Sequence, residues 1–409
     1  MNIINVDNLK TGQVLYEDVR DVSSRLLLAK GMQIKPEHQR IFKIWGVTEV
    51  MVEGNHRMEP ALEMDVNPET VKQVTALLES HYQNVDRNYP AIKELFRISV
   101  AYRSRQAVID AKPSVNGNAE GDTLKLPPGY LKKKIDLTEI KLPEIPAIIF
   151  ELNEVIAAPL TSAQDIARIV NKSPSIAALL LRVVNSAFYG FPSRIDSIPR
   201  AVTMIGSKEI TNLALGISTM RIFKSIPGGT INMSAFIRHS LATGLLARVM
   251  AAHKNIQQTE QLFISGLLHD IGRLIIYKYF PDQAGAIFSP HFNHDRSLLE
   301  MEKDILGWNH ARIGKYLLEK WKLPLSLENN IYHHHQPLRS KDPVKTTIVH
   351  MADIMANSLG IGTSGARGIS GFDAEAWEYF GLPPASLKGI IQQALHQLTP
   401  LESIFTNTP

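Results

Sequence analysis

The chain has 409 residues, which predicts two or three domains, and its 44% hydrophobic and 21% charged residues are typical of a globular protein. The 44 Lys and Arg exceed the 40 Asp and Glu by only four, without a dense basic run, so nucleic-acid binding through bulk charge is not indicated. Cysteine is absent, which excludes disulfides, thiol catalysis, iron–sulfur clusters and cysteine-bound zinc, so any metal must be held by His, Asp and Glu.

The N-terminal segment MNIINVDNLKTG is polar from its first residues and lacks the apolar core of a signal peptide. No apolar run anywhere in the chain approaches the roughly 20 residues that a membrane-spanning helix needs. We therefore expect a soluble, cytoplasmic protein without a membrane partner.

Residues 1–55 predict a small α+β module without a catalytic constellation. Turn signals at residues 11–12 and 30–31 separate short stretches of strand-forming residues, and residues 36–45 have the pattern of one helix. The expected strands lie at residues 13–16, 25–29 and 47–52.

Residues 56–136 predict a helical stretch followed by a flexible linker. Residues 68–105 have helical periodicity and few helix breakers. Residues 113–129, PSVNGNAEGDTLKLPPG, are rich in Gly, Pro and Asn and poor in apolar residues, which is typical of a mobile connection between domains.

Residues 137–409 predict one large all-helical domain, which can divide into two lobes. Apolar residues recur at intervals of three to four, and Ser162 and Ser173-Pro174 are typical helix starts. No strand pair and no internal repeat is visible, so the fold class is mainly α. The clearest periodic segments are residues 147–157, 176–184, 237–251 and 261–279.

Histidines cluster in this part of the chain: ten of the 14 lie between residues 239 and 350. Asp270 and Asp353 lie in the strongly apolar contexts LLHDIG and VHMADIMA, where a carboxylate needs a cation, a metal or several hydrogen bonds. Imidazole and carboxylate ligands suit divalent Fe, Mn, Zn, Co or Ni, and an adjacent His-Asp pair can serve two ions. The candidate metal ligands are His239, His269, Asp270, His310, His334, His335 and Asp353.

Other histidines have plainer interpretations. His291 and His294 are expected to be loop residues in solvent, and His253 and His350 are expected at the surface or in helix packing. Successive residues of a helix diverge by about 100°, so at least one residue of the triplet 333–335 should point away from a shared site.

Two sets of motifs make the chain similar to known families. The order His239, His269-Asp270, Asp353 resembles the HD superfamily of metal-dependent phosphohydrolases. Residues 142 to about 360 resemble more specifically the HDOD family of bacterial signalling and regulatory proteins, through LPEIPAIIFEL, VVNSAFYGFPSRIDSIPRAVTMIG, GLLHDIGRL, HARIGKYLLEKWKLP and HHHQP. Residues 1–55, with DNLKTGQVL and LLLAKGMQI, resemble more weakly the small module ahead of some HD-GYP phosphodiesterases.

The resemblance implies an all-helical, two-lobed domain that acts in signalling, often as a scaffold for kinases, response regulators or cyclic-dinucleotide enzymes. It assigns His239 to the first histidine of the HD core, His269 and Asp270 to the signature pair and His310 to the next histidine. His334 and His335 then match the paired histidines, and Asp353 the terminal aspartate. Many members of the family lack part of this metal site, whereas this chain keeps its whole outline.

The chain departs from the catalytic HD-GYP branch at three places. Gln336 to Arg339 (QPLR) stand where that branch has Glu-Arg and a Gly-Tyr-Pro loop. Ala235 stands where a three-metal variant needs Glu, and Arg273 follows the HDIG motif in place of Lys. Arginine still offers a fixed positive fork to a phosphate.

Three functions follow from these patterns. The first is a regulatory protein whose HDOD domain binds signalling partners and keeps a divalent metal site for up to two ions, structural or sensing. The second is a metal-dependent phosphohydrolase acting on a cyclic dinucleotide or another nucleotide, with Asp270 and Arg273 as its catalytic residues. The third is a nucleic-acid-binding regulator, suggested only by the short helices at residues 166–184, and it is the least favoured because no basic recognition helix is visible.

Overall fold

The computed structural model of the protein describes most of the chain. The described residues are 2–6, 9–20, 26–45, 47, 49–53, 67–110, 140, 142–157, 162–191, 193–223, 226, 231–288, 297–366, 368–369 and 371–406. The linker expected at residues 113–129 lies outside them. Among the described helices, none combines the length and the apolar character that crossing a bilayer requires.

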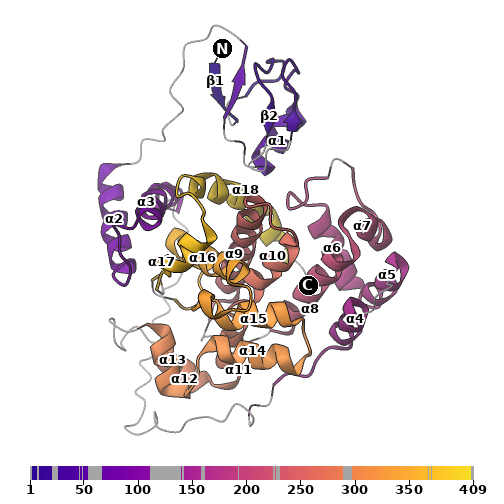
Figure 1. The fold of residues 1–409 in the computed structure, drawn as a ribbon, viewed down its shortest axis with the longest axis vertical. Helices are drawn as coiled ribbons and strands as arrows, with labels where there is room; N and C mark the ends of the chain where they lie inside the picture. The colour runs from indigo at the N-terminus through magenta and orange to yellow at the C-terminus, as the bar shows by residue number, and fades with distance from the viewer. Residues whose placement is uncertain are drawn as a thin grey trace.

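The N-terminal residues form a small module of two antiparallel strand pairs and one helix (Figure 1). Strand β1 (Asn2–Asn5) pairs with β4 (Glu49–Val52), and β2 (Val19–Arg20) pairs with β3 (Leu26–Leu28). Residues 14 and 15, expected in a strand, make isolated bridges instead. Phe42 on helix α1 (Pro36–Ile44) packs with Leu15, Val50 and Val52 in a hydrophobic core that belongs to this module.

A helical hairpin follows, made of α2 (Pro68–His81) and α3 (Pro90–Asp110). The side chain of Asn67 caps α2 by accepting a hydrogen bond from the backbone N–H of Glu69. The sequence pattern predicts one helical stretch here, but the chain turns after residue 81 and restarts at Pro90, a residue that suits a first helical turn. Buried residues of both helices belong to the same core as the large helical domain, so the hairpin packs as part of that domain.

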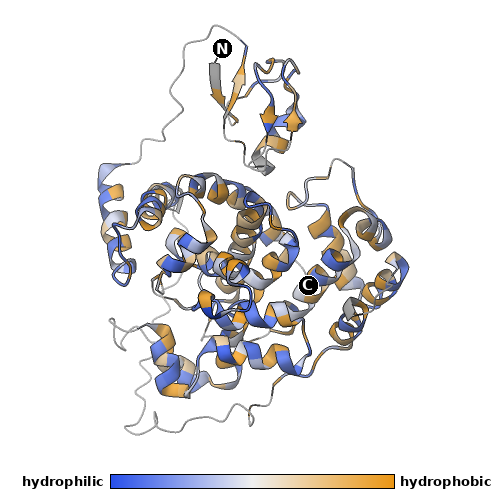
Figure 2. Ribbon diagram, viewed as in Figure 1, coloured by the Kyte–Doolittle hydropathy of each residue, from blue (hydrophilic) through white to orange (hydrophobic). Residues whose placement is uncertain are grey.

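The first set of helices in the large domain is α4 (Ala147–Ala157), α5 (Ala163–Asn171), α6 (Pro174–Val184), α7 (Ile198–Ile205) and α8 (Ser207–Ile222). Ser162 begins α5 with a capping box, since Ser162 and Asp165 satisfy each other's backbone N–H groups. The Asn185 side chain donates to the Ile195 carbonyl at 2.7 Å and accepts from its N–H at 2.7 Å, which fixes the irregular connection after α6. Hydrophilic and hydrophobic residues alternate around outer helices such as α5 (Figure 2).

The second set surrounds α9 (Met233–His253), a buried helix that packs against α10 (Thr259–Leu268), α16 (Pro343–Leu359) and α18 (Ser386–Thr406) (Figure 1). A Cβ atom on Gly266 would lie 2.7 Å from the Cα of Gly244, so the two glycines allow α9 and α10 to touch along their backbones. The remaining helices are α11 (Ile271–Tyr279), α12 (Pro281–Phe288), α13 (Leu298–Leu306), α14 (His310–Lys320), α15 (Leu325–His333), the short η4 (Pro337–Arg339) and α17 (Ala374–Phe380).

The expected fold class is confirmed: the chain is mainly α-helical and begins with a small module that contains strands. The one interruption in the segment expected at residues 261–279 falls between α10 and α11. His269 and Asp270 occupy that interruption, so the break in the helix lies at the centre of the candidate site.

Candidate metal centre

Five helical segments bring the seven predicted ligands together. His239 lies on the buried helix α9, and His269 and Asp270 lie between α10 and α11. His310 is the first residue of α14, and Asp353 lies in the middle of α16. The last two ligands, His334 and His335, follow the C-terminal end of α15.

The first group of ligands contains His239, His269, Asp270 and Asp353, with one ligand atom of each lying within 4.8 Å of the others. Nε2 of His239 lies 3.1 Å from Oδ1 of Asp353, and Nε2 of His269 lies 3.4 Å from the same oxygen. Nε2 of His269 is also 3.1 Å from Oδ2 of Asp270. All four side chains are buried.

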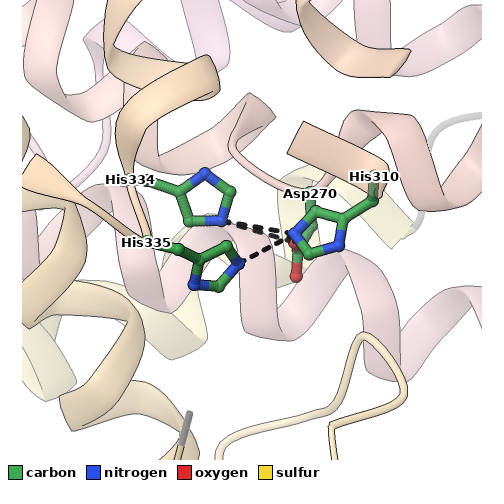
Figure 3. A group of neighbouring side chains, drawn as sticks. All are labelled: Asp270, His310, His334 and His335. Atoms are coloured by element: carbon green, nitrogen blue, oxygen red, sulfur yellow. Dashed lines mark hydrogen bonds and ion pairs between the residues drawn. The ribbon is translucent and has the colours of Figure 1, made fainter. Parts of the chain in front are cut away.

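The second group contains Asp270, His310, His334 and His335, again with one ligand atom of each within 4.8 Å of the others. The three imidazoles turn toward Asp270 (Figure 3). Nε2 of His310 lies 3.0 Å from Oδ1 of Asp270, 2.9 Å from Nε2 of His335 and 3.4 Å from Nε2 of His334. Asp270 therefore presents one carboxylate oxygen to each group.

In three of the histidines, Nδ1, the ring nitrogen that faces away from the cluster, already makes a hydrogen bond. Nδ1 of His269 donates to the carbonyl of Gly266 and Nδ1 of His334 donates to the carbonyl of Ile331, both at 2.7 Å. Nδ1 of His310 donates to a carboxylate oxygen of Glu302 at 2.7 Å. Because a carbonyl or carboxylate only accepts, these contacts fix the proton on Nδ1 and leave Nε2 directed at the cluster, as in metal-ligating histidines.

Two residues of the site were not predicted from the sequence. Glu302 on α13 is fully buried and accepts from both the ring and the backbone N–H of His310. Asn357 lies one turn after Asp353 on α16, and its amide donates to Oδ1 of Asp353 at 2.7 Å. A carboxylate eight residues before a ligand carries no sequence signal, whereas the spacing Asp353 to Asn357 is a readable i, i+4 pair.

Arg273 lies beside the cluster and is 4% exposed. Its Nη1 donates to Oδ2 of Asp270 at 2.9 Å and to the hydroxyl of Ser364, while its Nε lies 3.5 Å from a carboxylate oxygen of Glu302. The guanidinium therefore balances two buried carboxylates and orients Asp270.

Neighbouring charges set the protonation of the buried ligands. Burial alone would raise the pKa of Asp270, but Arg273, His269 and His310 hold it well below its usual range. Burial alone would lower the pKa of His269, but Asp270 and Asp353 raise it to about 10. The pKa of His334 falls to about 3, because burial is reinforced by His269 and His310.

The residues fit a metal in their chemistry and in their unmet bonding capacity. His269 Nε2 and Asp270 Oδ1 are buried atoms that have ion-pair contacts, at 3.1 Å to Asp270 Oδ2 and 3.0 Å to His310 Nε2, but no well-formed hydrogen bond among the described residues. Ligand atoms on opposite sides of a divalent ion lie about 4 Å apart, comparable with the spread within each group. The buried His and Asp side chains could thus hold a metal through His269 Nε2 and Asp270 Oδ1.

The other histidines of this part of the chain that the structure describes belong to neither group. The ring of His333 packs on Tyr332 with 4.6 Å between ring centroids, so this member of the triplet turns aside. His350 is buried in helix packing, where its Nδ1 donates to the carbonyl of His334 at 2.8 Å. His253 is half-buried at the end of α9, and His291 and His294 lie outside the described residues.

Metal binding is expected to strengthen as the pH rises. In the metal-free protein His269, with its pKa near 10, carries a proton on Nε2 at neutral pH, and an ion must displace that proton. We expect the apparent association constant to rise about tenfold per pH unit between pH 6.5 and 8.5, for one proton released. Calorimetry in buffers of different ionisation enthalpy measures this release, and an affinity independent of pH would contradict it.

Deprotonation of His269 is expected to make the metal-free protein less stable at alkaline pH. The pKa of His269 lies above its ordinary value of about 6.5, so its contribution to the free energy of unfolding is complete below pH 6.5 and is lost as the pH rises toward 10. Denaturant unfolding of the metal-free protein at pH 6.5 and pH 9 should show this decrease.

Comparison with known proteins assigns part of the helical domain to a known domain family. Residues 142–337 match the family model of the HDOD domain. An uncharacterized protein of Treponema pallidum (strain Nichols) is 26% identical over 220 residues, which cover 52% of this chain and 41% of that protein. The match therefore spans less than half the length of this curated relative.

Solved structures share the fold at low identity. A candidate phosphohydrolase from Shewanella amazonensis SB2B is 20% identical with a TM-score of 0.54, covering 65% of this chain and 95% of that one. An HDOD domain protein of unknown function from Geobacter sulfurreducens is 20% identical with a TM-score of 0.51, covering 63% and 84%. A candidate signal transduction protein from Marinobacter aquaeolei VT8 is 18% identical with a TM-score of 0.51, covering 79% and 69%.

The motifs at residues 142 to about 360, the mainly α-helical fold and the family match agree with one another. The chain therefore contains an HDOD domain at residues 142–337.

Proposed function

We propose that the chain is a cytoplasmic, bacterial signal-transduction protein whose HDOD domain binds partner proteins and keeps a two-ion His/Asp metal centre for structure or sensing. The observation that carries this proposal is the burial of the metal centre away from solvent. Six of the seven ligand residues are at most 5% exposed, and only His335 is partly buried. A catalytic centre must admit its substrate, whereas a structural or sensing ion needs only ligands.

The seven ligands would hold the ions in two sets that share Asp270. Bound Fe or Mn would supply positive charge to the buried carboxylates and, for iron, a change of oxidation state without cysteine. The residues of the chain do the rest: Glu302 and the carbonyls of Gly266 and Ile331 orient the imidazoles, and Arg273 orients Asp270.

The partners we propose are kinases, response regulators or cyclic-dinucleotide enzymes. The similarity to the signal transduction protein of Marinobacter supports this context but identifies no partner. The N-terminal module, with its own core around Phe42, is a separate folding unit suited to docking or sensing.

A metal-dependent phosphohydrolase acting on a nucleotide is the second candidate, and the partial exposure of His335 favours it. A phosphodiester would approach Asp270 past the partly exposed His335. Arg273 is less suited to its predicted catalytic role, because its Nη1 already bonds Asp270 and Ser364 and a phosphate would have to displace them.

Two assays on the metal-loaded protein separate these functions. The first follows phosphate-ester hydrolysis with bis-p-nitrophenyl phosphate and a panel of cyclic dinucleotides, with Asp270→Ala as the blank. The second measures binding of purified kinases, response regulators and cyclic-dinucleotide enzymes by biolayer interferometry, with His269→Ala beside the wild type.

We expect no hydrolysis above the blank and a partner that still binds His269→Ala. Metal-dependent hydrolysis that disappears in Asp270→Ala would replace the regulatory proposal with the enzymatic one.

A further inference from the structure

The α2–α3 hairpin, which lies outside the matched HDOD residues, packs against the end of α16 just beyond the ligand Asp353. Three buried hydroxyls join the two parts: Ser358 of α16 bonds to Tyr82 and, at 2.5 Å, to Ser99. The three side chains are at most 1% exposed. Buried hydroxyls without partners are costly, so this contact fixes one docked position of the hairpin.

A second contact leads from the hairpin directly to the metal ligand. Nη2 of Arg103 on α3 donates to the backbone carbonyl of Asn357 at 3.0 Å. The amide of Asn357 donates to Oδ1 of Asp353 at 2.7 Å, the same oxygen that faces His239 and His269. Arg103 therefore fixes the backbone of Asn357, and the side chain of Asn357 in turn orients the ligand Asp353.

A third contact reaches the other aspartate. The segment 360–369, of which residue 367 is not described, follows α16, and we name it the glycine strap. The backbone N–H of Ile369 donates to the carbonyl of His81 at the end of α2, at 3.0 Å. Near the middle of the strap, Ser364 accepts from Arg273, which in turn bonds Asp270.

The strap also lies directly on the helix that carries His239. The N–H of Thr363 donates to the carbonyl of Ala235 on α9 at 3.1 Å. Gly362 has a φ of +63°, and a Cβ there would come within 2.2 Å of that carbonyl oxygen, so only glycine fits. The position of the strap is therefore fixed by α2 on one side and by α9 on the other.

We propose that the α2–α3 hairpin completes the metal centre, with Arg103 and Asn357 as positioning residues for Asp353. The inference rests on the metal centre of the proposed function and adds a way in which metal occupancy is regulated. Docking of the hairpin raises metal affinity, and metal binding strengthens docking by the same factor, because the two equilibria are linked. A signal that moves the hairpin thereby changes metal occupancy.

The test measures Co²⁺ affinity and the visible Co²⁺ absorption spectrum of full-length variants. Asn357→Leu keeps the size of the side chain but removes the amide donor, and Arg103→Ala removes the contact from α3. We expect each to weaken Co²⁺ binding by about 10- to 100-fold and to shift the spectrum, as loss of outer-shell partners does in other metal sites. Arg103→Lys, which keeps the charge and a donor, should recover part of the affinity.

Arg97→Ala is the matched control, because Arg97 lies on the same helix but is exposed and, among the described residues, forms its ion pair with Glu94. It should bind Co²⁺ as the wild type does. Wild-type affinity and spectrum in both Asn357→Leu and Arg103→Ala would overturn the proposal. A wild-type protein that binds no Co²⁺ would overturn the metal centre itself, and with it this inference.

Hydrogen exchange on the wild-type protein tests the coupling without any substitution. We expect the amides of α3 to exchange about 10- to 100-fold more slowly with Co²⁺ bound than without it, matching the change in affinity. Equal exchange of α3 in both states would contradict the coupling even if a variant fails to fold.

Discussion

Replacing Asp270 with alanine is expected to abolish metal binding and to destabilise the helical domain. Asp270 belongs to both ligand groups, so its loss leaves each with only three ligands. It also accepts from Arg273, which is 4% exposed, at 2.9 Å. Leaving a buried charge with fewer partners costs about 3–5 kcal/mol in the free energy of unfolding. Elemental analysis and denaturant unfolding measure the two effects.

Two further variants make this prediction specific. Asp270→Asn keeps the shape and one acceptor oxygen, so it should lose the metal but less of the stability. Asp196→Ala removes an aspartate whose side chain is 73% exposed in the same domain, and it should change neither quantity. An Asp270→Ala protein with the metal content of the wild type would contradict the shared role of this carboxylate.

Local patterns in the sequence predicted the helices well. The expected segment 147–157 coincides with α4, and Ser162 begins α5 with its side chain as the cap. Helix periodicity and capping depend on residues a few positions apart, so they are readable without the fold. The division of the hairpin between residues 81 and 90 was missed, because it depends on how α2 packs against α3 and how α3 packs against α16.

The ligand set was predicted from motifs, whereas its supporting residues were not. The apolar contexts of Asp270 and Asp353 indicated buried carboxylates that need partners, and both are at most 5% exposed. Arg273 was expected to meet a phosphate, and the structure places it against Asp270 and Glu302. Glu302 comes close to His310 only through the turn between α13 and α14, so no short-range pattern marks it.

The buried charges around the cluster nearly balance in the absence of metal. Asp270, Asp353 and Glu302 carry negative charge, while Arg273 and the protonated His269 carry positive charge. The carboxylates Asp270 and Glu302 raise the pKa of His310 against the effect of its burial. Each charge is held by its neighbours, so the loss of one carboxylate affects both the fold and the ligands.

Glu302→Ala should therefore have an effect comparable with the loss of a ligand. Glu302 is fully buried and accepts from the backbone N–H of His310 at 2.8 Å and from its Nδ1 at 2.7 Å. Its other oxygen lies 3.5 Å from Nε of Arg273. Alanine leaves these donors unpaired, so we expect a loss of about 3 kcal/mol in the free energy of unfolding and a 10- to 100-fold weaker Co²⁺ affinity.

Glutamine at the same position separates orientation from charge. The amide oxygen of Glu302→Gln can still accept from His310, so this variant should keep most of the stability. Its Co²⁺ affinity should still fall by about tenfold, because the neutral amide makes the imidazole less basic. Glu319→Gln, on the exposed end of α14, is the control and should match the wild type in both measurements. If Glu302→Ala also matched the wild type, His310 would not depend on its carboxylate partner, and the metal ligands would be oriented by the backbone carbonyls and helix packing alone.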